Sequence, residues 1–117
     1  MDLVFTAGHD TGIYRNDGRS RSNDNPKLHY GTGGMLHGRK YMFTSSWNAP
    51  IEAFTVKGEF FEEQDEDQVL IGVHKMNQFT GLERIEGFHF HEMEKGVTDE
   101  KIAEDKREYL KHLNSVF

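Results

Sequence analysis

Cysteine is absent from this sequence, and so is any apolar run long enough to cross a bilayer. Without cysteine the chain has no disulfides, no thiolate metal sites and no thiol that could act as a nucleophile or redox group. Any redox chemistry must therefore come from a bound cofactor. Residues 1–5 contain neither a basic region nor a secretory apolar stretch, so we expect a cytoplasmic protein without a membrane partner.

Basic side chains are in the minority, with 14 Lys and Arg against 20 Asp and Glu and a formal charge of -6. The resulting field repels nucleic acid and anionic membrane surfaces, so we expect no nucleic-acid partner. A length of 117 residues with 35% hydrophobic and 29% charged side chains is typical of one soluble folded domain. We therefore interpret residues 1–117 as a single unit.

The first third of the chain has little periodicity. Residues 1–7 have the apolar spacing of a helix end, and Gly8 is well suited to terminate that helix. Residues 9–38 are rich in Gly, Asn, Asp and Ser, which predicts a long loop. A loop of this length inside a small domain is usually functional or disordered.

The middle of the chain predicts one strand and two helices. Residues 40–46 alternate and are rich in strand-favouring side chains. Pro50 is placed to start a short helix after an Asn48 cap. A second helix is expected from the acidic residues 65–67 to about Phe79, because acidic side chains favour the positive end of a helix dipole.

Residues 82–91 predict the second strand, with Phe88 and Phe90 on one face and His89 and His91 on the other. The last helix is the most strongly marked. Thr98 can cap it, acidic residues occupy its first turn, and an apolar stripe follows at helical spacing, made of Ile102, Tyr109, Leu110, Leu113, Val116 and Phe117.

Residues 40–117 are therefore expected to form a segment of strand, helix, strand and helix. This order implies parallel strands joined by a crossover, which places the chain in the α/β class. Two strands are too few for a stable open sheet, so the sequence indicates that further strands belong to this fold.

A turn follows the first strand at residues 45–50. The carboxyl ends of strands are where open α/β sheets bind ligands, and backbone amides with the planar Trp47 could bind a flat heterocycle there. A generic strand-to-helix turn with Trp47 in the core explains the same residues.

Two stretches are specific enough to indicate a relationship, residues 41–54 (YMFTSSWNAPIEAF) and residues 74–79 (HKMNQF). Both resemble the modulator of drug activity B family, whose members are flavodoxin-like NAD(P)H:quinone oxidoreductases that bind FAD. Further matches extend the resemblance over nearly the whole chain, at residues 4–6, 8–9, 17–19, 31–35 and 109–113.

The resemblance implies the carboxyl-terminal part of a flavodoxin-like three-layer fold with parallel strands, in which the amino-terminal strands and the phosphate loop are missing. It implies FAD and NAD(P)H as cofactors, a quinone as substrate, and a homodimer or a complementing amino-terminal half as partner. The flavin ring would be lined by Ser46, Trp47, Asn48 and Ala49. The quinone site would include Phe54 and a Tyr14 supplied by the neighbouring subunit, although Tyr14 is equally well explained as a surface aromatic.

No catalytic side chain carries over from the resemblance. The wider quinone reductase group relays charge through a Tyr and a His after this turn, and here the nearest counterparts are Phe54 and the pair Phe60 and Phe61. Residues 31–34 are Gly-rich but are followed by an expected strand, whereas phosphate loops precede a helix. The alternative to a reductase is therefore a non-catalytic or complementing fragment that binds no flavin alone.

A metal site is the rival hypothesis for the histidines. His89 and His91 share one strand face, with Glu92, Glu94 and either His74 or His9 as further candidates. The spacing of these residues is not diagnostic, so we expect no metal. We expect His74 to be a hydrogen-bonded packing residue of a helix.

Overall fold

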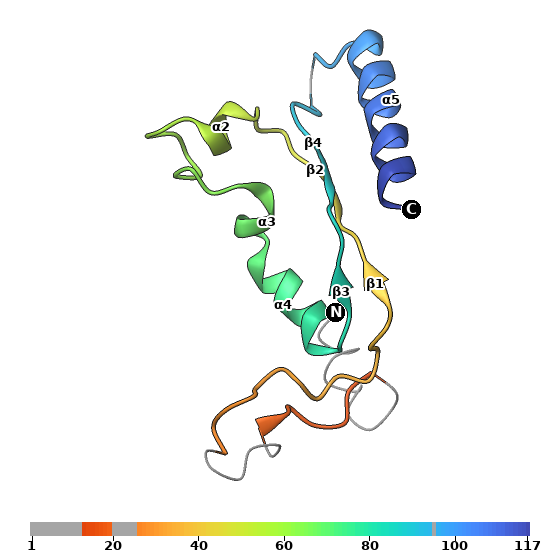
Figure 1. Ribbon diagram of the computed structural model, residues 1–117. Coiled ribbons are helices and arrows are strands. Elements are labelled where there is room, and N and C mark those ends of the chain that lie inside the picture. The colour runs from red at the N-terminus through yellow and green to blue at the C-terminus, as the bar shows by residue number, and fades with distance from the viewer. Residues whose placement is uncertain (1–12, 20–25, 95) are drawn as a thin grey trace. The chain divides into compact units, whose positions relative to one another are not determined.

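The computed structural model describes residues 13–19, 26–94 and 96–117 (Figure 1). The helix end expected over residues 1–7 and part of the loop expected over residues 9–38 lie outside them. The chain divides into two compact units, one made of Met1–Tyr41 and Leu70–Arg84 and the other of Met42–Val69 and Ile85–Phe117. The expectation that residues 1–117 form a single unit stays a prediction.

The first unit contains a parallel pair of short strands and one helix. Strand β1 (Lys40–Tyr41) pairs with β3 (Glu83–Arg84), and Lys40 lies opposite Glu83. Helix α4 (Ile71–Phe79) precedes β3 and ends at Thr80, after which Gly81 takes a positive φ of 97°. The expected termination near Phe79 and Gly81 is confirmed.

The described part of the long loop is held by backbone contacts. Tyr14 forms an isolated antiparallel bridge with Gly34, and the Leu36 amide donates to the Thr80 carbonyl at 2.9 Å. A Cβ on Gly34 would lie 2.1 Å from the Thr80 carbonyl carbon, so only glycine allows this approach. Gly33 and Gly34 therefore serve close packing of the backbone, whereas Gly31 has open space around it and adopts a positive φ of 90°.

The second unit contains the other parallel pair. Strand β2 (Thr44–Ser46) pairs with β4 (Phe88–Phe90), with Ser45 opposite His89. Because side chains alternate across a strand, the neighbours of Ser45 and His89 face the opposite side of the pair. The parallel pairing expected from the order of elements is confirmed in both units.

Helix α5 (Asp99–Val116) packs against the phenylalanine face of β4 in the second unit (Figure 1). The Tyr109 ring lies 5.3 Å from Phe88 and 5.4 Å from Phe90, measured between ring centroids. The helix begins as expected, since the Thr98 hydroxyl accepts a hydrogen bond from the Lys101 amide at 3.1 Å. The expected apolar stripe is only partly covered, because Leu110 remains 55% exposed.

The helix expected from residues 65–67 onward is interrupted. It forms α3 (Glu66–Val69) and α4, and Leu70 stands between them with ψ at 17°. A reciprocal cap starts α3: the Gln68 amide donates to Asp65 Oδ1 at 2.8 Å, and the Asp65 amide donates to Gln68 Oε1 at 2.7 Å. This arrangement is a capping box with Asp in place of Ser or Thr.

The short helix after the turn begins later than the sequence predicts. Helix α2 (Glu52–Thr55) follows Ile51, and no side chain caps it. The expected Asn48 cap is therefore wrong. Pro50 lies ahead of the helix, and its carbonyl accepts a hydrogen bond from the Ala53 amide at 3.0 Å.

An aromatic cluster forms the centre of the second unit. The Phe54 ring stacks on Phe61 with centroids 4.2 Å apart, and Trp47 and His91 meet it edge to face at 5.1 and 5.6 Å. Phe54 is 1% exposed and is the one hydrophobic side chain that is fully buried among the described residues. Within the described ranges, no helix has the length and apolar character needed to cross a membrane.

Candidate cofactor-binding turn

The turn after β2 is attached to the end of β4 by backbone hydrogen bonds. The Trp47 amide donates to the Phe90 carbonyl at 2.8 Å, and the Trp47 carbonyl accepts from the Met93 amide at 3.0 Å. The Ala49 carbonyl accepts from the Glu92 amide at 3.3 Å. The carboxyl ends of two parallel strands therefore fix this turn, which is the position where open α/β sheets bind ligands.

Donors remain available at the outer side of the turn. Ser46 and Asn48 are exposed, and no described residue accepts a hydrogen bond from the Asn48 or Ala49 amide. Two adjacent amides beside an aromatic ring suit the polar edge of a planar heterocycle. The turn thus fits the ring of a flavin by the chemistry of its donors.

The proposed substrate residues lie in different units. Phe54 is buried under Phe61 and Trp47, so it shapes the turn by packing and would reach a substrate only after those rings moved. Tyr14 belongs to the first unit, where its ring meets Phe79 edge to face at 5.2 Å. Their roles in quinone binding stay predictions.

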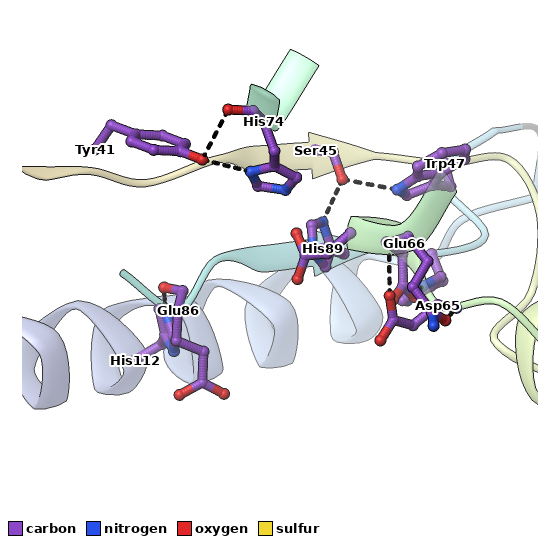
Figure 2. A network of polar contacts seen from close by, with 12 residues as sticks. Tyr41, Ser45, Trp47, Asp65, Glu66, His74, Glu86, His89 and His112 are labelled. Carbon is purple, nitrogen blue, oxygen red and sulfur yellow. Dashed lines mark hydrogen bonds and ion pairs between the residues drawn. The ribbon is translucent and has the colours of Figure 1, made fainter. Parts of the chain in front are cut away.

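A line of polar side chains extends inward from Trp47 (Figure 2). The indole Nε1 donates to Ser45 Oγ at 2.7 Å, and Ser45 Oγ lies 2.5 Å from His89 Nδ1. On the far side of the imidazole, Asp67 Oδ1 of α3 lies 3.5 Å from His89 Nε2. The His89 side chain is 11% exposed, so this line lies largely inside the second unit.

His91 has a similar acidic neighbour on α3. Its Nε2 lies 2.5 Å from Glu66 Oε1, and its backbone carbonyl accepts a hydrogen bond from Lys101 Nζ at 2.7 Å. Lys101 also pairs with Asp105 at 2.7 Å. The imidazoles of His89 and His91 are therefore largely buried, and each approaches one carboxylate of α3.

The metal hypothesis gains no support from this geometry. Among the described residues no group of three or more His, Asp or Glu side chains is arranged to hold a metal ion. His89 and His91 each approach one carboxylate, and those carboxylates explain their orientation.

His74 lies in the first unit and is 1% exposed. Its Nδ1 lies 2.8 Å from the Tyr41 hydroxyl, which also donates to the His74 carbonyl at 3.4 Å. The expectation of a hydrogen-bonded packing residue is confirmed.

Asp17 and Arg19 form an exposed ion pair in the loop region of the first unit. The Arg19 side chain and amide hydrogen-bond to the Asp17 carboxylate and lower the pKa of Asp17, and the same pairing raises the pKa of Arg19. Both side chains are in contact with solvent, so this pair affects the local loop and not the turn at Trp47.

The chain belongs to the flavodoxin-like fold family, whose model matches residues 1–113. It is 43% identical, over all 117 residues, to the NADPH:quinone oxidoreductase MdaB of Haemophilus influenzae, and it covers 58% of that protein. It is 42% identical, again over its whole length, to an uncharacterized protein of Schizosaccharomyces pombe, of which it covers 57%. The chain therefore spans somewhat more than half the length of these relatives, and the α/β fold of parallel strands expected from its sequence is confirmed.

Sequence reasoning missed the roles of Ser45, His89 and Asp67. A signal was present for Ser45, because it lies two residues before Trp47 and alternate residues of an extended segment share a face. The pairing of Ser45 with His89 depends on strand register, and the approach of Asp67 depends on how α3 packs. Neither can be obtained from local sequence.

Proposed function

We propose that this chain is the carboxyl-terminal portion of an FAD-dependent NAD(P)H:quinone oxidoreductase. The observation that supports the proposal most directly is the turn at residues 46–49, at the carboxyl ends of two parallel strands. It combines an aromatic ring with two amides that have no hydrogen-bond acceptor among the described residues. The identity of 43% to a protein named NADPH:quinone oxidoreductase supports the same activity.

In this proposal the chain binds and orients, and it has no nucleophile or general base of its own. Ser46, Trp47, Asn48 and Ala49 hold the flavin ring, and Phe54 supports Trp47 beside the substrate. Tyr14 of a neighbouring subunit completes the quinone slot in a homodimer. The bound flavin supplies the hydride chemistry between the nicotinamide and the quinone.

The phosphates of FAD require a different part of the protein. Helix amino-termini with free amides are the usual phosphate sites, yet the Gly-rich residues 31–34 lead into an antiparallel bridge and packed backbone. This observation favours a second candidate function, in which the chain is a fragment that needs a complementing amino-terminal half and binds no flavin alone.

A flavin-retention assay tests both candidates. The purified chain is incubated with FAD, desalted and examined by visible absorption and light scattering. Retained oxidised flavin on a dimer, with quinone-dependent NADPH oxidation, supports the reductase. A colourless chain that retains FAD only after the amino-terminal part of the Haemophilus influenzae relative is added supports the complementing fragment.

Variants in the turn test the assigned residues in whichever sample retains flavin. Replacing Trp47 with Ala should weaken flavin retention by roughly three- to tenfold, the effect expected for one aromatic stacking contact. Phe117→Ala is the matched control, since Phe117 is 84% exposed at the end of α5 and outside the turn. Equal retention by Trp47→Ala and the control would contradict the assignment of Trp47.

A further inference from the structure

The hydrogen bond between Trp47 and Ser45 has a definite direction. An indole nitrogen can only donate, so Ser45 Oγ accepts the bond of 2.7 Å from Trp47. Ser45 Oγ keeps its proton and a second lone pair, so the direction of its contact with His89 Nδ1 at 2.5 Å is set by the tautomer of His89. The hydroxyl therefore links the indole to the imidazole.

The surroundings of Nε2 favour one tautomer of His89. Nε2 is buried and has no hydrogen-bond partner among the described residues, but Asp67 Oδ1 lies 3.5 Å away. A carboxylate at that distance favours a proton on the facing nitrogen, so Asp67 supports the tautomer in which Nδ1 can accept.

The same three residue types form the catalytic triad of many hydrolases, but the geometry here is different. In a triad, Nε2 of the histidine faces the serine and Nδ1 faces the carboxylate. Here the two nitrogens are reversed, and a lone pair of Ser45 Oγ is occupied by the indole N–H. Ser45 is therefore a link between two side chains and not a nucleophile.

Trp47 also has apolar contacts. Phe54 and Phe61 meet the indole edge to face at 5.1 and 5.7 Å. The indole has a single polar atom, Nε1, and its hydrogen bond to Ser45 is directional. This bond therefore favours the ring orientation that points Nε1 at Ser45.

We propose that Ser45 and His89 are positioning residues that hold the Trp47 indole in one orientation at the turn, with Asp67 acting through His89. The consequence for cofactor binding rests on the proposed function, in which Trp47 contacts the flavin ring. One net hydrogen bond corresponds to about a fivefold preference for the held orientation over the released one. Releasing the indole should therefore increase its mobility several-fold.

Trp47 is the one tryptophan in the sequence, so its fluorescence reports this orientation without flavin. The measurements are fluorescence anisotropy and acrylamide quenching of the full chain, with circular dichroism to check folding. Ser45→Ala removes the acceptor, whereas Ser45→Thr keeps a hydroxyl. We expect quenching to increase several-fold in the first variant and to stay close to the original chain in the second.

A matched pair at His89 separates positioning from packing. The side-chain oxygen of His89→Asn can occupy the place of Nδ1, whereas the longer His89→Gln places its polar group near Nε2, and both lose the ring. We expect Asn to preserve the Trp47 signal and Gln to release the indole. Equal signals in the Asn and Gln variants, or an unchanged signal in Ser45→Ala, would overturn the proposal.

Flavin retention by the same variants separates this inference from the proposed function. If released variants also lose flavin, the positioning of Trp47 matters for cofactor binding. Alternatively, the variants release the indole and retain as much flavin as the original chain does. That result would support the positioning role of Ser45 and His89 and contradict the proposed contact between Trp47 and the flavin. The fluorescence result decides the positioning role even where the original chain retains no flavin.

Discussion

Each unit of this chain pairs a histidine with a hydroxyl, and the two pairs have different surroundings. In the first unit, Tyr41 and His74 form a pair in which His74 is fully buried and contacts the hydroxyl on both its ring and its carbonyl. In the second unit, Ser45 and His89 form a pair that continues to Trp47, beside amides that are available for binding. The same chemistry therefore serves packing in one unit and connects to a candidate site in the other.

The difference between the two pairs follows from what each pair contacts. A hydrogen-bonded pair around a fully buried histidine contributes to stability. A pair that is hydrogen-bonded to Trp47 can also orient a side chain of the candidate site. Substitutions of buried packing residues should therefore lower the free energy of unfolding most. Substitutions of Ser45 or His89 should change the orientation of Trp47 most.

The largest stability effect should come from the aromatic centre of the second unit. Phe54→Ala removes a buried ring, and we expect a loss of about 3–5 kcal/mol in the free energy of unfolding. Denaturant unfolding measures it. The control is Phe60→Ala, since Phe60 is 82% exposed and should change stability by less than about 0.5 kcal/mol. Similar losses in both variants would show that burial of Phe54 is not what stabilises the unit.

His74→Ala should have the second-largest effect on the free energy of unfolding, and it tests the contrast between His74 and His89. It leaves the Tyr41 hydroxyl without its ring partner and opens space beside it, at an expected cost of roughly 2–3 kcal/mol. Denaturant unfolding gives the loss, and Trp47 anisotropy at native conditions should not change. An altered Trp47 signal in the folded variant would contradict the distinction between the packing role of His74 and the contact of Ser45 and His89 with Trp47.

The capping box of α3 should have a moderate effect. Asp65→Ala removes the acceptor for the Gln68 amide, and we expect a loss of about 1 kcal/mol by denaturant unfolding. Because α3 carries Asp67 and Glu66, Trp47 quenching should rise slightly as well. Glu63→Ala, at an exposed position ahead of the helix, is the comparison that should leave both measurements unchanged.

The smallest effect should come from Asp17, which is exposed in the first unit. Its pKa is lowered by Arg19, so the pair stabilises the fold above the unfolded pKa of about 3.8, and this contribution is lost as the pH falls through the lower folded value. Thermal unfolding of Asp17→Asn and the original chain should differ slightly at neutral pH and converge in strong acid. A difference that grows on acidification would contradict this sign.

Local sequence signals were sufficient where one element decides the outcome. The Thr98 cap, the alternating faces of residues 88–91 and the end of α4 before Gly81 depend on neighbouring residues and were confirmed. The Asn48 cap was wrong because the backbone of residues 47–49 is bonded to the end of β4 instead. The break at Leu70 lies two residues before Gly72, a residue that weakens helix interiors, so a local signal was present that the expected continuous helix did not take into account.

The sequence by itself determined the class of fold and the turn at residues 46–49, because periodicity and a specific run of residues are local properties. Only the tertiary structure decided which side chains stand behind that turn. Strand register places Ser45 opposite His89, and the packing of α3 brings Asp67 to the other side of the imidazole. Hydrogen-bond partners far apart in sequence are selected by distance and direction in space, and no spacing along the chain encodes them.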